Sequence, residues 1–377
     1  MQYRTMPRSE DKLSALGFGC MRFPTTAEGK IDEARSFAML HAAYQQGVNY
    51  FDTAWPYHSG DSELFLGRFL QQIERSNVYV ATKLPCWLIK SRQDMDDYLN
   101  KQLHRLQVDC IDYYLLHALN KRSWKSMQDL GVIPFLEEAK KAGKIKHIGF
   151  SFHDAYPVFR KIVLAYNWDF CQIMLNFLDT QYQAGIRGYR LALSRNMGII
   201  AMEPLRGGKL VHPVPQEIQD LWKKSKFGRS TLERALRWVW NLKGSSVLLS
   251  GMSSLSQVEQ NSQFADVCLP EELPASELKL YAKVRREYIK RIPIMCSECR
   301  YCLPCPSQVS IPSVFGMYNE AMMFGDKQRL TKEYTSFISA ENRADKCTNC
   351  GVCLSKCPQH IDIPTEMKKI KEYFSEA

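Results

Sequence analysis

The stretch DTAWPYHSGDSE, residues 52–63, follows an apolar run at residues 48–51 that has the pattern of a buried strand. It places the carboxylate of Asp52 and the phenol of Tyr57 close to the end of that strand. Taken alone, such a loop is common and specifies neither a fold nor a reaction. It becomes informative because two later apolar runs also end in a polar side chain.

Lys83 follows the apolar run at residues 78–82, and His117 follows the run at residues 111–116. These runs belong to a set of eight strand candidates, with amphipathic, helix-like stretches between them. The candidates are residues 13–21, 48–52, 78–83, 111–117, 145–151, 170–176, 199–203 and 247–251. Strict alternation of strands and helices predicts parallel strands with crossover helices.

Eight strand–helix units over about 290 residues are typical of a (β/α)8 TIM barrel. A doubly wound open sheet is the alternative, but it requires a Gly-x-Gly-x-x-Gly fingerprint after the first strand. Residues 16–21, LGFGCM, do not supply that fingerprint. In a barrel the C-terminal strand ends meet at one mouth, so the polar residues after the second, third and fourth strands are expected to converge.

The length of 377 residues suits two domains rather than one small core. Hydrophobic residues make up 45%, and no stretch approaches the ~20 apolar residues of a membrane-spanning helix. The polar residues 1–10 contain no apolar signal core. The sequence therefore predicts a cytoplasmic protein without a membrane span.

Basic residues outnumber acidic ones by 50 to 40, which gives a net charge of +10. Such an excess fits attraction to phosphate-bearing cofactors, or to an acidic electron carrier such as ferredoxin or flavodoxin. Aromatic residues do not alternate with the basic clusters as a nucleic-acid groove requires, so nucleic acid is not expected as a partner.

The four polar residues at the expected mouth suit proton transfer to a carbonyl oxygen. A lysine ammonium beside a tyrosine favours the phenolate and lowers the phenol pKa, and a carboxylate keeps the lysine charged and oriented. The tyrosine can then give a proton to the oxygen while hydride arrives at the carbon, and the histidine can orient the carbonyl. The predicted catalytic residues are Asp52, Tyr57, Lys83 and His117.

The Asp-Thr-Ala-x-x-Tyr loop, the Thr-Lys after the next strand and the Leu-Leu-His after the fourth resemble the aldo-keto reductases, over about residues 10–265. This resemblance implies a nicotinamide cofactor, with Ser151 and Gln172 at its carboxamide and residues 204–210 over its pyrophosphate. It also implies an adenosine site at the last strand end. The implied cofactor-binding residues are Ser151, Gln172, Leu205, Arg206, Gly207, Gly251, Ser253, Gln257 and Asn261.

The chain departs from this family pattern at the cofactor. Met202 stands where many relatives have an aromatic residue that stacks on the nicotinamide. Gln257 and Ser254 stand where NADP-preferring relatives carry arginine or lysine for the 2′-phosphate, and neutral side chains bind phosphate less firmly than a guanidinium fork. NAD, NADP and a flavin all stay open as the redox cofactor.

The surroundings of the mouth are expected to shape the substrate pocket. The polar residues 1–12 are expected to form a short lid or hairpin that adds to this pocket, together with residues 117–127. Of the five cysteines before residue 290, Cys20 is the one expected to face the mouth.

Eight of the thirteen cysteines fall in two runs near the C-terminus. The runs are Cys296-x2-Cys299-x2-Cys302-x2-Cys305-Pro306 and Cys347-x2-Cys350-x2-Cys353-x3-Cys357-Pro358. Similar tails follow them, CPSQVSIP at 305–312 and CPQHIDIP at 357–364, which indicates an internal duplication. The second run matches the bacterial iron–sulfur pattern, and the first is one residue shorter before its last cysteine.

Two [4Fe–4S] clusters are predicted, because the last cysteine of each such run commonly serves the other cluster. The predicted ligands are Cys296, Cys299, Cys302 and Cys357 for one cluster, and Cys347, Cys350, Cys353 and Cys305 for the other. Zinc is disfavoured because two zinc sites would not need a fourth cysteine and a proline in each run. The segment between the runs has a helical pattern, which resembles helical two-cluster ferredoxin domains fused to oxidoreductases.

The predicted architecture is a TIM barrel at residues 1–290 followed by a small, mainly α-helical ferredoxin-like domain at residues 291–377. The expected function is an oxidoreductase that transfers hydride between NAD(P)H and a small carbonyl or alcohol substrate, with Tyr57 as general acid and two clusters for electron transfer. Nicotinamides move electrons in pairs and clusters move them singly, so two alternatives stay open. In the first, the clusters pass electrons to a bound flavin or directly to the substrate, and no nicotinamide takes part. In the second, the barrel is a binding module of an electron-transfer or redox-sensing protein.

Overall fold

The computed structural model describes residues 1–375, which form two compact units. The first unit comprises residues 1–207 and 232–274, and the second comprises residues 208–231 and those from 275 onward. This division differs from the predicted boundary after residue 290. The reason is that helix α11 (Ala275–Lys290) packs against helices α8 (Gln216–Trp222) and α12 (Ile311–Phe324), all of which belong to the second unit.

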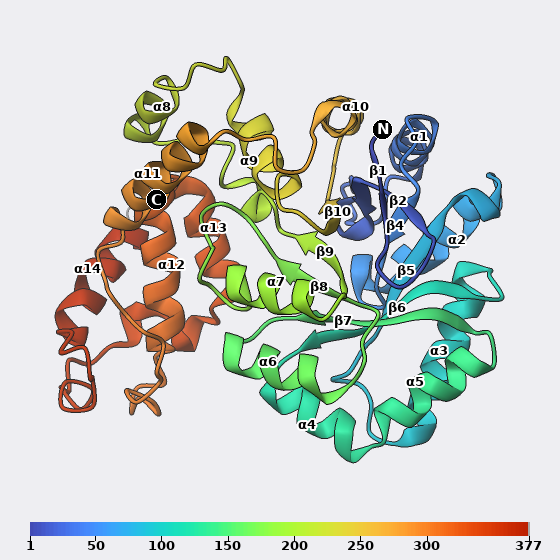
Figure 1. The fold of residues 1–377 in the computed structure, drawn as a ribbon. Helices are drawn as coiled ribbons and strands as arrows, with labels where there is room; N and C mark the ends of the chain where they lie inside the picture. The colour runs from blue at the N-terminus through green and yellow to red at the C-terminus, as the bar shows by residue number, and fades with distance from the viewer. Residues whose placement is uncertain (376–377) are drawn as a thin grey trace. The chain divides into compact units, whose positions relative to one another are not determined.

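The first unit is a closed barrel of eight parallel strands in the order β10-β3-β4-β5-β6-β7-β8-β9 (Figure 1). The strands are β3 (Leu16–Gly19), β4 (Tyr50–Asp52), β5 (Tyr79–Leu84), β6 (Ile111–Leu119), β7 (Ile145–Phe152), β8 (Phe170–Met174), β9 (Gly198–Met202) and β10 (Ser245–Ser250). Pairing of Leu248 with Leu16 closes the barrel between its last and first strands. The predicted TIM barrel is confirmed, and each predicted strand is present with its ends shifted by a few residues.

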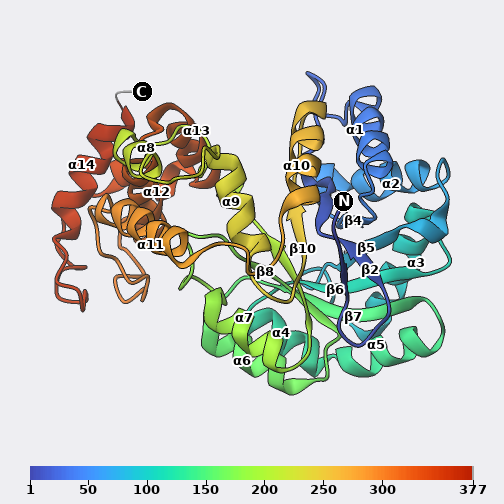
Figure 2. The same ribbon diagram turned by 45° about the horizontal axis from the view of Figure 1, so that its top comes forward.

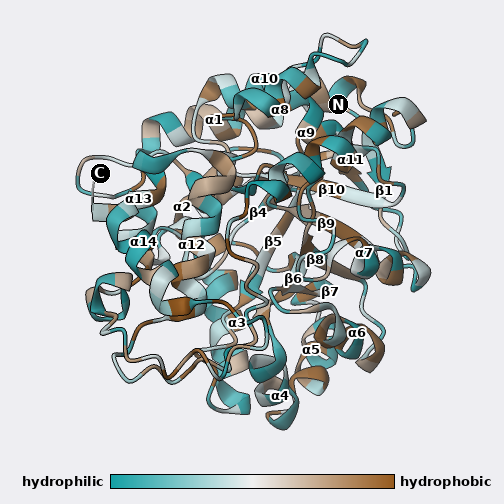
Figure 3. Cartoon of the chain, turned by 90° about the vertical axis from the view of Figure 1, so that its left-hand side faces the viewer, coloured by the Kyte–Doolittle hydropathy of each residue, from teal (hydrophilic) through white to brown (hydrophobic). Residues whose placement is uncertain are grey.

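Helices surround the barrel, and several of them bury one face. They are α1 (Glu33–Gln45), α2 (Ser62–Leu70), α3 (Arg92–Leu106), α4 (Lys121–Asp129), α5 (Val132–Lys141), α6 (Tyr156–Ala165), α7 (Gly185–Ser194), α9 (Thr231–Trp240) and α10 (Leu255–Val267). In α5 the buried residues are Val132, Phe135, Leu136 and Ala139, a spacing that places them on one face of a helix. Individual helices accordingly carry both hydrophobic and hydrophilic segments (Figure 3).

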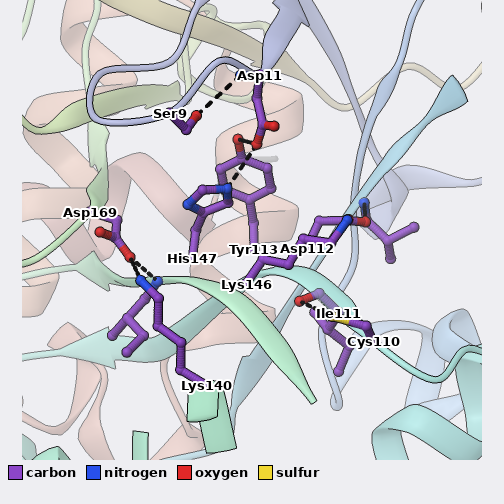
Figure 4. A network of polar contacts seen from close by, with 12 residues as sticks. Ser9, Asp11, Cys110, Ile111, Asp112, Tyr113, Lys140, Lys146, His147 and Asp169 are labelled. Carbon is purple, nitrogen blue, oxygen red and sulfur yellow. Dashed lines mark hydrogen bonds and ion pairs between the residues drawn. The ribbon is translucent and has the colours of Figure 1, made fainter. Parts of the chain in front are cut away.

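An N-terminal hairpin of β1 (Tyr3–Thr5) and β2 (Lys12–Ser14) closes the end of the barrel where the strands begin. The carboxylate of Asp11 accepts a hydrogen bond from the Tyr113 hydroxyl at 2.7 Å and lies 2.8 Å from Nε2 of His147 (Figure 4). Both partners lie near the starts of their strands, β6 and β7. A hairpin was expected, but its predicted place at the substrate pocket is wrong, because these contacts hold it at the opposite end from the mouth.

The second unit is helical, as predicted for the C-terminal domain. It contains α8 (Gln216–Trp222), α11 (Ala275–Lys290), α12 (Ile311–Phe324), α13 (Lys327–Phe337) and α14 (Ile363–Ser375), which gather around each other in Figures 1 and 2. Phe315, Leu330 and Ile370, from three of these helices, belong to one buried apolar core. Among the described residues, none of the helices has the length and apolar character needed to span a bilayer.

Candidate active site and cluster sites

Asp52 and Lys83 form a buried ion pair at the mouth of the barrel. Lys83 Nζ donates to Asp52 Oδ1 at 2.6 Å and to the backbone oxygen of Thr53 at 2.7 Å. Each of the two charged side chains is only 1% exposed. Asp52 ends β4, and Lys83 lies in the neighbouring strand β5, so the strand ends bring the pair together as the sequence predicted.

Tyr57 lies beside this pair on a short 3-10 turn, η2 (Tyr57–Gly60). Lys83 Nζ lies 5.1 Å from the centre of the Tyr57 ring and interacts with its hydroxyl by hydrogen bonding. Burial raises the pKa of Tyr57, and the attraction of Lys83 only partly offsets this. The expected lowering of the phenol pKa is therefore wrong for the protein alone, and the phenol is protonated at neutral pH.

His117 completes the group, with its ring centre 6.1 Å from that of Tyr57 and 5.1 Å from that of Trp87. Burial, followed by repulsion from Lys83, holds its pKa well below the usual range, so the imidazole is neutral. The buried Nδ1 atom has no hydrogen-bond partner among the described residues. It is therefore available to a bound molecule.

The charges of the ion pair follow from competing effects. Burial alone would lower the pKa of Lys83, but the attraction of Asp52 and Tyr57 outweighs it and raises the pKa. Burial raises the pKa of Asp52, opposed by Lys83. Lys83 thus stays an ammonium beside a neutral phenol, which is the arrangement needed to donate a proton from Tyr57.

Two cysteines, rather than one, lie at this group. Cys20 is fully buried and close enough to Asp52 and Lys83 for both charges to influence its thiol. Cys86 is the second: it accepts a hydrogen bond from the backbone of His117, and burial raises its thiol pKa to about 12. Both thiols are neutral neighbours of the site at physiological pH.

A second buried polar group lies behind the site, and the sequence reasoning missed it. We call it the Glu63 network: Glu63, Thr82, Gln102 and Arg105. Glu63 is fully buried and accepts from the Thr82 hydroxyl at 2.7 Å and from Gln102 Nε2 at 2.6 Å. Gln102 Nε2 also donates to the backbone oxygen of Lys83 at 3.0 Å. The network thereby fixes the strand that carries the lysine.

Arg105 joins the Glu63 network to the loop that carries Tyr57. Its guanidinium lies 3.4 Å from Glu63 Oε2, donates to the backbone oxygen of Gly60 at 3.4 Å, and lies 3.5 Å from the centre of the Trp55 ring. Within this loop His58 and Ser59 have φ values of 51° and 56°, a left-handed conformation that costs energy in residues other than glycine. Contacts on both sides of the strained pair hold the loop in place.

The residues predicted at the nicotinamide carboxamide are neighbours in the barrel. Ser151 and Gln172 are register partners on β7 and β8. The Gln172 amide nitrogen lies 3.7 Å from the Met202 sulfur, and its buried oxygen Oε1 has no hydrogen-bond partner among the described residues. An orphaned carbonyl oxygen beside a hydroxyl can bind a carboxamide, so these residues fit that part of a nicotinamide.

The predicted adenosine-binding residues lie where β10 leads into α10. The Ser254 side chain caps α10, and Ser253 N donates to Gln257 Oε1 at 2.9 Å. Asn261 donates to Ser250 Oγ at 3.2 Å, while its buried oxygen Oδ1 lacks a partner in the described chain. The helix N-terminus suits a phosphate group, and the acceptor oxygen of Asn261 suits an N–H or O–H donor of the same ligand, so the two together fit a phosphate-bearing nucleotide.

Arg22 is a cation near this predicted nucleotide end that the sequence reasoning missed. It follows the first barrel strand and is exposed, and its Cδ atom lies 3.0 Å from where a Cβ on Gly251 would be. A larger residue at position 251 would therefore displace it. Only the closed barrel brings the ends of β3 and β10 together, so no local sequence signal pointed to Arg22.

Eight cysteines line two cavities in the second unit. The first cavity is lined by Cys296, Cys299, Cys302 and Cys357, and the second by Cys305, Cys347, Cys350 and Cys353. Ile311 and Ile363 contribute to the walls of both. No three His, Cys, Asp or Glu side chains of residues 1–375 are arranged to hold a single metal ion. Four sulfurs around each apolar cavity instead fit a [4Fe–4S] cluster.

Comparisons with known proteins match the two parts separately. A model of the Aldo/keto reductase family matches residues 15–275, and a model of the 4Fe-4S dicluster domain matches residues 295–361. L-galactose dehydrogenase from Arabidopsis thaliana is 29% identical over 295 residues, covering 69% of this chain and 87% of that protein.

Two further proteins are similar to this chain, one in sequence and one in its solved structure. The aldo-keto reductase yakc [NADP(+)] of Schizosaccharomyces pombe is 27% identical over 221 residues, covering 56% of this chain and 63% of that protein. The solved structure of aldo-keto reductase AKR11C1 from Bacillus halodurans, in its holo form, has a TM-score of 0.65 at 26% identity. That match covers 75% of this chain and 96% of the other.

Proposed function

Because the chain belongs to the aldo/keto reductase family and carries a fused 4Fe-4S dicluster domain, we propose that it reduces a small carbonyl compound to an alcohol, or catalyses the reverse, with Tyr57 as the general acid. The observation that carries this proposal is the contact of a neutral phenol with the buried Lys83–Asp52 pair. The family's substrates are small carbonyl compounds, and the substrate of this chain is proposed within that class.

Tyr57 supplies the proton that the carbonyl oxygen takes up. Its raised pKa keeps the proton in place until substrate binds. As the proton leaves, the Lys83 ammonium stabilises the phenolate that forms, and Asp52 keeps that ammonium oriented. His117 is neutral, so its unpartnered ring nitrogen can contact the substrate oxygen without adding charge.

The proposed reductant is NADPH or NADH, which when bound supplies the hydride that reduces the carbonyl carbon. Ser151 and Gln172 would hold its carboxamide, and the start of α10 would hold its adenosine phosphates. The name of the S. pombe relative includes NADP(+), which favours NADP. The aliphatic chain of Arg22 lies beside Gly251, and its guanidinium would supply a charge that Ser254 and Gln257 lack for a phosphate at this end.

The second unit is proposed to hold two [4Fe–4S] clusters, one in each cysteine-lined cavity. When bound they supply one-electron transfer. Their proposed external partner is an acidic electron carrier such as a ferredoxin or flavodoxin, for which the basic chain is a suitable match. We do not propose a flavin-binding residue.

The test uses protein purified without oxygen and with its clusters intact. Oxidation of NADPH or NADH is followed against a panel of aldehydes and ketones, and Tyr57→Phe is compared with Tyr44→Phe, a matched change elsewhere in the barrel. We expect Tyr57→Phe to lose about 10²–10⁴-fold in turnover while nucleotide still binds, and the control to retain activity. Full activity in Tyr57→Phe would refute the role of this phenol. Released flavin together with no binding of either nicotinamide would refute the proposed reductant.

A further inference from the structure

The two cysteine-lined cavities of the second unit repeat each other residue by residue. The duplicated runs correspond at a constant offset, apart from the one extra residue before the last cysteine of the second run. Every residue that lines the first cavity has a counterpart at this offset that lines the second. Pro312 thus corresponds to Pro364, while Ile311 and Ile363 line both cavities and are each other's counterparts. Any difference between the two sites must therefore come from the positions at which the side chains differ.

One of these positions holds Arg300 in the first cavity and Gly351 in the second. The backbone has the same conformation at both, with φ values of 64° at Arg300 and 73° at Gly351. The turn that follows is also the same, because Leu303 N donates to Arg300 O and Leu354 N donates to Gly351 O, each at 3.0 Å. The two residues occupy equivalent places and differ in the side chain.

Glycine is the residue that this left-handed conformation favours, so Arg300 is the exception. Lack of space does not explain the glycine of the second cavity, since a Cβ at Gly351 would make an ordinary contact of 3.7 Å with Leu354 Cδ1. The first cavity therefore carries a side chain that its backbone disfavours. Such local strain is typical of functional sites.

Arg300 is also the one cation that lines either cavity in the described part of the chain. The other differing pairs exchange one neutral side chain for another. Glu298 has the opposite charge and lies nearby in the sequence, but it does not line the cavity. Lys346 and Lys356 each precede a cysteine of a different cavity, and neither of them lines one. Among the lining residues, the first cavity thus has one more positive charge than the second.

A cation beside an iron–sulfur cluster makes the cluster easier to reduce. Reduction adds one negative charge to the cluster, and the reduction potential depends on nearby charge and on solvent exposure. The guanidinium of an arginine is cationic at any physiological pH, so it stabilises the reduced form more than the oxidised form. Arg300 is exposed, so salt should screen this interaction in part.

We propose that Arg300 sets the order of reduction of the two proposed clusters and makes the first cavity the site that is reduced first. An external one-electron carrier supplies the electron. When it arrives at the second site it passes to the first: the second site is oxidised by one electron, the first is reduced by one, and no bond or proton changes. This inference rests on the two clusters of the proposed function and on no residue of the barrel.

The first experiment is a redox titration of the whole chain, purified without oxygen and followed by electron paramagnetic resonance, with iron content measured in each variant. Arg300→Gln removes the charge, and Arg286→Gln is the control, since Arg286 is an exposed arginine of α11 that lines neither cavity. In Arg300→Gln we expect the higher of the two midpoint potentials to fall by about 59 mV, a tenfold change in the equilibrium constant of a one-electron couple, and the lower one to stay. The shift should shrink at about 1 M salt, where the Debye length is about 3 Å. The control should show no shift.

The second experiment places the charge in the other cavity. Gly351→Arg should raise the lower midpoint potential and leave the higher one, so the gap between the two narrows from the opposite side. Unshifted potentials in Arg300→Gln with intact iron content, or a shift of the lower potential instead of the higher, would overturn the proposal. Absence of two cluster signals in the unaltered protein would overturn the proposed clusters themselves, and this inference with them.

Discussion

Replacing Arg105 with methionine tests whether the Glu63 network holds the catalytic loop. The change keeps the length of the side chain but removes the cation that faces Glu63 and Trp55. Glu63 would remain fully buried with only the neutral donors Thr82 and Gln102. Removal of one partner of a buried pair costs about 3–5 kcal/mol, and Arg105 is 25% exposed, so a loss of about 2–3 kcal/mol in the unfolding free energy is expected.

The size of this loss should depend on pH, because Glu63 titrates. Burial raises the pKa of Glu63, and the Thr82 and Gln102 hydrogen bonds and Arg105 lower it, with burial outweighing them. Without Arg105 the pKa of the folded state rises further above the unfolded value. The folded protein then binds a proton more readily than the unfolded chain, so stability gained at low pH is lost as pH rises through the folded pKa.

The assay is urea unfolding of the anaerobic protein, followed by far-ultraviolet circular dichroism at pH 6 and pH 8.5. Arg105→Met should be more destabilised at pH 8.5 than at pH 6, and Glu63→Gln, which keeps the shape and removes the charge, should show a smaller and pH-independent loss. Turnover of Arg105→Met should also fall, because the loop that carries Tyr57 loses the hydrogen bond that Arg105 donates to Gly60. An equal loss at both pH values would refute the reasoning that an unpaired Glu63 charge is responsible.

Three further outcomes are expected. Tyr57→Phe should keep its fold, which circular dichroism can check, and should give a flat pH profile in any residual turnover because the titrating phenol is gone. Cys357→Ser and Cys305→Ser should each lower the iron content by about half and alter different cluster signals in electron paramagnetic resonance. The reason is that Cys357 ends the second run but lines the first cavity, while Cys305 ends the first run but lines the second. Loss of both clusters from one substitution in a folded protein would contradict separate sites. Gly149→Ala should lower the unfolding free energy by about 1–3 kcal/mol in denaturant titrations, because its Cβ would lie 2.5 Å from the Phe170 ring; a neutral effect would show that the barrel wall yields there.

The barrel and the ends of its strands could be predicted because the signals are local. Apolar runs that alternate with amphipathic, helix-like stretches predict parallel strands, and each run can be recognised without knowing its partners in space. Asp52 and Lys83 follow such runs directly, so a barrel brings them together without further information. The cysteine runs are equally local, and their spacing accounts for which four line each cavity.

Other features could not be predicted because they depend on partners distant in the sequence. Glu63 and Gln102 are 39 residues apart, and neither residue type signals a buried contact. The pKa of Tyr57 was predicted with the wrong sign because the neighbour, Lys83, can be inferred from sequence while the extent of burial cannot. The hairpin was wrongly expected at the mouth. The contacts of Asp11 with Tyr113 and His147, which hold it at the opposite end, join residues more than 100 positions apart and leave no local pattern in the sequence.

Local sequence patterns were sufficient to predict the barrel, the residues at its mouth and the two cysteine runs, because periodicity and spacing act over a few residues. The tertiary structure alone decided which charges are buried and which partners they find. Lys209 is the clearest case: its loop position suggests phosphate, but carboxylates 111 and 124 residues away take up its charge. Electrostatic partners are chosen by distance and by exclusion of water, and both exist only after the chain has folded.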